Sequence, residues 1–203
     1  PTRRPRWQKA KGSTVPNVLE DDFLKASQKT SILAAAGMVA DEWQERLITS
    51  KLNACVVCSR QAGKSTGAAA LAAHTFYYQV GSLTLVVAPT EAQSSELLRR
   101  AKTLLSCMPG NGGMGVSNAT TRIESPMGSR IIALPGTDSS TRGYSPHLLI
   151  MDEAAYLPDD TIKAMMPSVA VTRGRIVMLS TPSGRVGRFF EIFAATEDQI
   201  RRG

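Results

Sequence analysis

Ala54-Cys-Val-Val-Cys-Ser-Arg-Gln-Ala-Gly-Lys-Ser-Thr66 is the stretch that decides the fold of this 203-residue chain. Its first four residues are apolar and predict a buried strand, and the alanine-rich run after Thr66 predicts a helix. Between strand and helix lies a tight loop that ends in Gly63-Lys64-Ser65. Strand, loop and helix in this order are the setting that a phosphate-binding loop requires.

The phosphate loop, residues 58–65, predicts how a nucleotide is held. Backbone N–H groups of residues 62–65 are expected to surround the phosphates at the helix start, where the helix dipole also favours anions. Lys64 is expected to reach the β- and γ-phosphates of ATP, and the Ser65 hydroxyl to bind Mg²⁺. Cys58 stands where the GxxxxGK[ST] pattern has its first glycine, whereas Gly63, which allows close backbone approach, is kept. The residues of this segment predicted to bind ATP are Gln61, Ala62, Gly63, Lys64, Ser65 and Thr66.

A later apolar run carries two carboxylates at its end. Residues 148–151 resemble a central parallel strand, and Asp152 and Glu153 follow directly. Such strands end at the ligand crevice of an open α/β sheet. One carboxylate is then expected to hold Mg²⁺ while the other orients and deprotonates a water. A surface Asp-Glu pair is the simpler alternative, but the phosphate loop earlier in the chain favours ATP hydrolysis.

Apolar and amphipathic segments alternate along the chain. Strands are expected at 54–57, 83–88, 119–124, 130–134, 147–152 and 176–180, and helices at 18–36, 38–49, 65–79, 91–107, 159–165 and 186–195. The strands at 119–124 and 130–134 are expected to form a hairpin, and the glycine-rich residues 109–115 a mobile loop. The alternation predicts a three-layer α/β fold with a mostly parallel central sheet. At least one strand is expected between the phosphate-loop strand and the acidic strand, which favours the RecA-like (ASCE) division of phosphate-loop NTPases.

The composition is that of a globular domain with a basic N-terminal arm. The chain is 42% hydrophobic and carries a formal charge of +7, and residues 1–11 hold five basic residues without an acid. We expect a flexible arm at 1–17, which contacts nucleic acid or only solvent, and an ATPase domain at 18–203. Three cysteines and two histidines predict neither a disulfide framework nor a zinc site. The longest apolar stretch is too short to span a bilayer.

Six motifs occur in an order that resembles a known family. They are Trp43-Gln44, residues 59–66, Val87-Ala-Pro-Thr90, Thr141-Arg-Gly-Tyr144, residues 149–155 and Leu179-Ser-Thr-Pro-Ser-Gly184. Together they resemble the N-terminal ATPase domain of the large terminase subunit of tailed bacteriophages, over roughly residues 38–195. The resemblance implies an ATP-hydrolysing motor, with ATP and Mg²⁺ as cofactors, that translocates double-stranded DNA into a procapsid.

The same resemblance implies partners and a location. The implied partners are double-stranded DNA, a homo-oligomeric ring of this chain at the portal, the portal protein and the small terminase subunit, with no membrane. The implied location is the host cytoplasm, transiently at the viral procapsid. The family continues into a nuclease domain built around clustered acids, which nothing after Ala195 supplies. We therefore expect ATPase activity without nuclease activity.

The resemblance also implies roles for residues of the nucleotide site. Gln44 resembles the glutamine that reads the adenine edge, and Arg60 the loop arginine that contacts the γ-phosphate or a neighbouring acid. A surface helix glutamine and a surface ion pair are the respective alternatives. Asp152 resembles the metal carboxylate that acts with Ser65, and Glu153 resembles the catalytic base that acts with Lys64.

Two further motifs imply how hydrolysis is completed and used. Arg142 resembles the arginine finger, whose always-charged fork suits the developing phosphate charge, acting within one subunit or across a ring interface. Ser180 and Thr181 resemble the motif that couples hydrolysis to movement, close enough to sense the γ-phosphate through a water. An ordinary loop arginine and a strand-ending Ser-Thr-Pro turn are the alternatives.

Two other functions compete with the packaging motor. A helicase-like or remodelling ATPase of the same division needs a second RecA-like domain, for which 203 residues leave no room. A nucleotide-dependent assembly module binds ATP without hydrolysing it. The complete set Lys64, Ser65, Asp152 and Glu153 argues against that module, because a non-hydrolysing domain can lose its base freely.

Overall fold

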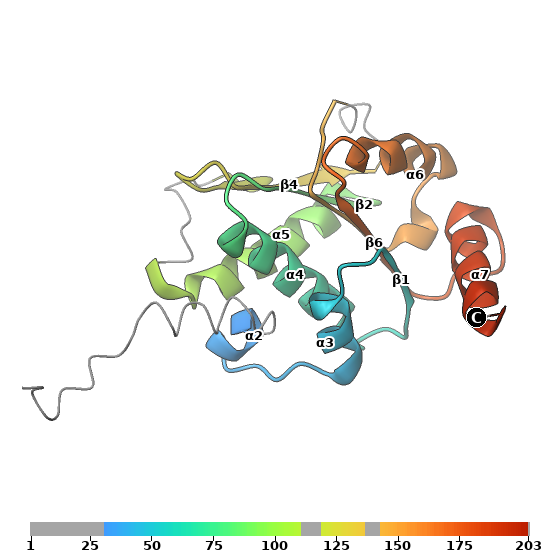
Figure 1. The fold of residues 1–203 in the computed structure, drawn as a ribbon, viewed down its shortest axis with the longest axis horizontal. Helices are drawn as coiled ribbons and strands as arrows, with labels where there is room; N and C mark the ends of the chain where they lie inside the picture. The colour runs from blue at the N-terminus through green and yellow to red at the C-terminus, as the bar shows by residue number, and fades with distance from the viewer. Residues whose placement is uncertain (1–30, 111–118, 137–142, 203) are drawn as a thin grey trace, which may run out of the picture.

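The fold was obtained as a computed structural model that describes residues 31–110, 119–136 and 143–202 (Figure 1). Its centre is a six-stranded sheet of order β1-β6-β5-β2-β4-β3, in which only β3 runs antiparallel to its neighbour. The strands are β1 (Ala54–Val57), β2 (Leu83–Ala88), β3 (Arg122–Glu124), β4 (Arg130–Pro135), β5 (Leu148–Asp152) and β6 (Arg175–Ser180). The predicted α/β fold with a mostly parallel sheet is confirmed.

Helices cover both faces of this sheet (Figure 1). They are α2 (Ser31–Ala35), α3 (Glu42–Thr49), α4 (Lys64–Tyr78), α5 (Glu91–Ser106), α6 (Asp159–Met165) and α7 (Gly187–Arg202), with short 3₁₀ turns η3 (Ala154–Tyr156) and η4 (Met166–Val169). Val86 of β2 packs in the layer of α4 and α5, whereas its neighbour Val87 packs in the layer of α6 and α7. Because successive strand side chains point to opposite faces, a central strand buried on both sides is largely apolar, as β2 and β5 are apart from Thr84 and the terminal Asp152.

Most predicted boundaries agree with the structure, and the differences have local causes. The second predicted helix begins at Glu42 rather than Met38, because Asp41 caps it: the Asp41 backbone N–H is bound by the Gln44 side chain. The strand predicted at 119–124 pairs only over Arg122–Glu124, and the last helix reaches Arg202 instead of residue 195. The basic arm at 1–17 and most of the predicted 109–115 loop lie outside the described residues.

The sheet order places three functional segments together at the carboxyl ends of the strands. β6 lies between β1 and β5, so the predicted intervening strand is confirmed. Val57 is in register with Ser180, and Asp152 with Leu179, so the three strands end together. The phosphate loop, the acidic pair and Ser180-Thr181 therefore meet where parallel strands present their carboxyl ends. Within the described part of the chain, no helix is long and apolar enough to cross a bilayer.

Candidate nucleotide site

Gly63 shapes the turn from the phosphate loop into α4. Its φ is +76°, and a Cβ at this position would lie 2.4 Å from the Gln44 side-chain nitrogen, so both backbone and space require glycine. Cys58 is not among the described residues with positive φ, so its backbone does not need the glycine that is usual there. The Cys58 N–H instead donates to the Ser180 carbonyl at 3.2 Å, which ties the loop to β6.

Lys64 is buried beneath this loop. Its side-chain nitrogen donates to the carbonyl oxygens of Ser59 at 3.0 Å and Cys58 at 3.4 Å. The ammonium is thereby held inside the curve of the loop, where phosphates are expected. The three cysteines are free, and burial raises the pKa of the Cys55 thiol to about 12, so this thiol is no nucleophile.

A cavity of about 400 Å³ opens beside the loop. Its lining comes from the phosphate loop and α4, from the end of β5 and from α5: Arg60, Gln61, Gly63, Lys64, Ser65, Thr66, Glu153 and Arg100. The structure thus brings five of the predicted loop residues, Arg60 and the predicted base to one hollow, whereas Ala62 is not among the lining residues. Arg142 lies outside the described residues, and its predicted role stays a prediction.

A second cavity, of about 370 Å³, does not suit metal-dependent chemistry. It lies where β5 and β6 begin, at the edge of the sheet opposite the phosphate loop, and Lys51, His147 and Arg175 contribute to its lining. None of its described lining residues is an acid. The cavity beside Glu153 is therefore the candidate nucleotide site.

Asp152 is a buried carboxylate beside that site. It is 6% exposed, and one of its oxygens accepts the Glu153 backbone N–H at 3.1 Å. Burial, and next the charge of Glu153, raise the pKa of Asp152, while the charges of Lys64 and Arg100 act in the opposite direction. A desolvated acid of this kind is stabilised as an anion by a nearby cation. Asp152 is not among the residues that line the cavity, but it is bonded to the backbone of Glu153, which lines the cavity together with Ser65. Mg²⁺ fits these residues, because it is usually held by one or two carboxylates together with phosphate oxygens, and Ser65 adds a hydroxyl.

Glu153 adopts a left-handed backbone, with φ 49° and ψ 44°. A non-glycine residue in this region is uncommon and is found where the surrounding contacts hold it. Those contacts come from the end of β6: one Glu153 carboxylate oxygen accepts the Thr181 N–H at 3.2 Å, the Thr181 hydroxyl at 3.1 Å and the Ser180 hydroxyl at 3.3 Å. Among the described residues, the other carboxylate oxygen accepts no hydrogen bond.

Ser180 and Thr181 therefore contact the predicted base directly. Both are buried, and the Ser180 hydroxyl also accepts the Ala155 N–H at 3.2 Å. The sequence predicts that these hydroxyls lie near a γ-phosphate; the structure adds that they bind Glu153. The end of β6 is consequently fastened both to the phosphate loop, through Cys58, and to the acidic pair.

Gln44 lies against the phosphate loop rather than on the surface. It is 5% exposed; its side-chain oxygen accepts the Asp41 N–H at 2.9 Å, and its nitrogen donates to the Gly63 carbonyl at 3.0 Å. Each end of the amide thus makes one hydrogen bond to backbone, which leaves a second N–H and a second oxygen lone pair for an adenine. The adenine-reading role stays a prediction, and the alternative of a surface glutamine is wrong.

Arg100 of α5 is a lining residue that sequence reasoning missed. It forms an ion pair with Glu96, one helical turn earlier, at 3.0 Å. The i, i+4 spacing of Glu96 and Arg100 is visible in the sequence, but such pairs are common on helix surfaces. Only the packing of α5 beside α4 brings Arg100 to the cavity.

Comparison with known proteins assigns the chain to a family. Residues 55–193 match the family described as RNA cytidine acetyltransferase NAT10/TcmA, helicase domain. The chain belongs to this NAT10/TcmA helicase-domain family. A relative is the tRNA(Met) cytidine acetyltransferase TmcA of Haloferax volcanii, 29% identical over 167 residues, which are 82% of this chain and 20% of that protein. The chain thus spans about a fifth of the length of this relative.

Phage terminases are among the solved structures similar to this NAT10/TcmA-family domain. The Thermus phage P74-26 large terminase ATPase domain is 23% identical, with a TM-score of 0.66 over 81% of this chain and 72% of that one. The HK97 large terminase has a TM-score of 0.71 at 15% identity, over 86% of this chain and 42% of that one. The large terminase of a thermophilic bacteriophage, solved in complex with ADP, has a TM-score of 0.58 at 13% identity, over 85% of this chain and 42% of that one. At these identities the likeness confirms the fold of the resemblance and not a terminase function.

Proposed function

We propose that this domain binds ATP with Mg²⁺ and hydrolyses it in the cavity between the phosphate loop and Glu153. The observation that carries the proposal is that Glu153, fastened by Ser180 and Thr181, lines the same hollow as Lys64 and Ser65. An acid is thereby held at the place where a phosphate-loop lysine would present a nucleotide. The family membership and the phage terminase solved with ADP support nucleotide use.

Each polar group then has a role in the reaction. The Lys64 ammonium binds the β- and γ-phosphates, and Gln61, Ala62, Gly63 and Thr66 surround them. Ser65 and Asp152 hold Mg²⁺, which neutralises charge that develops on the phosphate oxygens. The Glu153 carboxylate takes a proton from the attacking water, whose oxygen bonds to the γ-phosphorus as the bond to the β–γ bridging oxygen breaks, giving ADP and phosphate.

Protonation of Glu153 during hydrolysis could couple the reaction to movement of the end of β6. Hydrogen bonds to an ionised carboxylate are shorter and roughly twice as strong as neutral ones. Protonation would therefore weaken the three bonds by which Thr181 and Ser180 hold Glu153. The segment after Thr181 leads into α7, so this change would be felt at a helix on the far layer of the sheet.

We propose that the movement acts on double-stranded DNA, as the terminase resemblance implies. The ordered motifs over residues 38–195 support this, on a fold that the terminase ATPase domain shares. In that role the chain works as a ring at a viral portal, with the portal protein and the small terminase subunit, in the host cytoplasm. Arg142 supplies the finger, and Arg60 a second charge beside the γ-phosphate.

A helicase-like ATPase that acts on RNA is the second candidate. The family match over residues 55–193 favours it, as does the archaeal relative, whose name states that it modifies tRNA(Met). The two candidates share the ATP site and differ in the polymer that stimulates it.

Phosphate release from ATP, measured with and without a nucleic-acid polymer, tests both the proposed hydrolysis and the choice between the two candidates. The wild-type chain is expected to hydrolyse ATP and Glu153→Ala to bind but not hydrolyse it; equal turnover by the two would refute the catalytic assignment. ATP binding without turnover by either would instead favour the assembly module. Stimulation by duplex DNA but not by tRNA supports the packaging motor, and the reverse supports the RNA-directed enzyme.

A further inference from the structure

One guanidinium reaches the nucleotide cavity from outside the phosphate loop and the acidic strand. Among the described lining residues, Arg100 alone comes from α5; the others come from residues 60–66 and from Glu153. α5 lies beside α4 on the same face of the sheet (Figure 1). The buried residues of α5 pack in the core, while Arg100 lines the cavity together with the first residues of α4.

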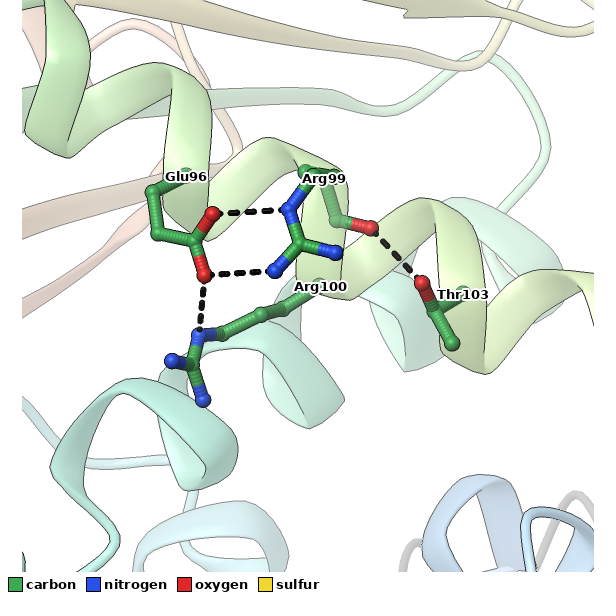
Figure 2. Close-up of polar contacts among 4 residues, drawn as sticks. All are labelled: Glu96, Arg99, Arg100 and Thr103. Carbon is green, nitrogen blue, oxygen red and sulfur yellow. Dashed lines mark hydrogen bonds and ion pairs between the residues drawn. The ribbon is translucent and has the colours of Figure 1, made fainter.

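Glu96 holds two neighbouring arginines in different ways (Figure 2). Arg99 uses two nitrogens on the two Glu96 oxygens, at 2.7 and 2.8 Å, so its fork is occupied. Arg100 donates only its Nε, at 3.0 Å. Figure 2 shows the two terminal nitrogens of Arg100 turned away from Glu96, and they make no hydrogen bond with a described residue. Arg100 thus keeps a pair of donors for another acceptor.

Arg100 adds its positive charge to the cavity that Arg60 and Lys64 also line. A planar guanidinium with two free donors matches the spacing of phosphate oxygens. Developing negative charge on a transferred phosphoryl group is stabilised by such fixed donors.

We propose that Arg100 is a catalytic residue that contacts the terminal phosphate of ATP from within the same chain, with Glu96 as the positioning residue that orients its guanidinium. This inference rests on the ATP hydrolysis proposed above and adds a residue to it. It gives the site a cation in cis that is separate from the finger expected at Arg142. A plain surface ion pair is the competing explanation, since the side chains of Arg100 and Glu96 are 45% and 42% exposed.

Arg99 provides a matched control. Arg99→Ala and Arg100→Ala each remove one arginine from the same carboxylate on the same helix, but only Arg100 lines the cavity. Both pairs are exposed, so neither change is expected to lower the thermal unfolding midpoint appreciably. The measurements are kcat and KM for ATP, together with Kd for ADP and for a non-hydrolysable ATP analogue.

Arg100→Ala is expected to lower kcat and to weaken binding of the ATP analogue. Loss of one charge-stabilising donor costs about 10²–10³ in rate in a closed site, and we expect roughly 10- to 100-fold for the half-exposed Arg100. Kd for the analogue should rise roughly tenfold while Kd for ADP stays within about twofold, because ADP lacks the contacted phosphate. Arg99→Ala should stay within about twofold on all measurements, and Glu96→Ala should lose about threefold in kcat.

Three results would overturn the inference. They are equal kcat values for Arg100→Ala and Arg99→Ala, an equal loss of ADP and analogue binding in Arg100→Ala, and wild-type kcat in Arg100→Gln, which serves if the alanine variant is unstable. Failure of the proposed function gives a different pattern, because the wild-type chain would then bind or hydrolyse no ATP at all. A loss of kcat in Arg100→Ala that Arg99→Ala does not share, in an active enzyme, supports the assignment.

Discussion

The three hydrogen bonds to Glu153 make Thr181→Val the most informative single change. Valine has nearly the shape of threonine, so the change removes the hydroxyl that donates to Glu153 at 3.1 Å and keeps the backbone N–H at 3.2 Å. Thr181 is 6% exposed and is not among the residues that line the cavity. The expected effect is therefore on the base and not on nucleotide affinity.

The magnitude follows from the number and type of these bonds. A hydrogen bond to a charged group contributes about 1.5–3 kcal/mol. Two donors remain on the same Glu153 oxygen, so we expect the lower end, about 1.5 kcal/mol. If losing this bond raises the activation free energy by the same amount, because Glu153 is less well oriented, kcat falls roughly tenfold, and KM for ATP stays within about twofold.

Steady-state phosphate release at saturating ATP measures this effect, and Thr181→Ser is the control because it keeps the hydroxyl. A thermal unfolding scan confirms that both variants remain folded. A kcat within twofold of wild type in Thr181→Val would show that the Thr181 hydroxyl does not orient Glu153. A loss in Thr181→Ser as large as in Thr181→Val would show the same, since the serine variant keeps a hydroxyl.

Three other predictions concern the loop, the metal and the ring. Gly63→Ala should abolish ATP binding, measured by calorimetry, and lower stability by about 1–2 kcal/mol, because alanine is strained at positive φ and its Cβ meets the Gln44 nitrogen; Gln44→Ala should relieve only the second cost. Burial raises the pKa of Asp152, so the folded chain binds this proton more readily than the unfolded chain, and Asp152 lowers stability as pH rises from the ordinary carboxyl pKa to the raised value in the folded chain. Asp152→Asn should therefore raise the metal-free unfolding midpoint at neutral pH and abolish Mg²⁺-dependent turnover. A lower midpoint would contradict this. Mixing Arg142→Ala with Glu153→Ala under assembling conditions should restore phosphate release if the finger acts across subunits, and no rescue would count against a shared site.

Much of the fold was predictable because the decisive signals are local. β1 and β2 were predicted to the residue, since short apolar runs between turn residues have few other solutions. The start of α3 was predicted four residues too early, because the capping box formed by Asp41 and Gln44 was overlooked. This pattern is local, so the correct boundary could have been predicted from the sequence.

Most residues of the site were predicted from the sequence, but the hydrogen bonds between them were not. Lys64, Ser65 and Glu153 follow from motif and spacing, and the structure gathers them at one cavity. The hydrogen bonds from Thr181 to Glu153 depend on the left-handed turn at Glu153, and the sequence contains no glycine there to announce it. The hydrogen bond from the Gln44 amide to the Gly63 carbonyl, which joins α3 to the phosphate loop, was not predicted, and the adenine-reading role of Gln44 stays a prediction.

The sequence by itself determined the alternation of strands and helices, the phosphate loop and the carboxylates at the end of β5, because periodicity and motif spacing act within a few residues. Only the tertiary structure decided which of these segments touch. β6 enters between β1 and β5, which sets Thr181 against Glu153, and α5 packs beside α4, which carries Arg100 to the cavity. Such neighbours are chosen by burial of apolar faces over the whole chain, so a helix arginine with no motif around it can become part of the site.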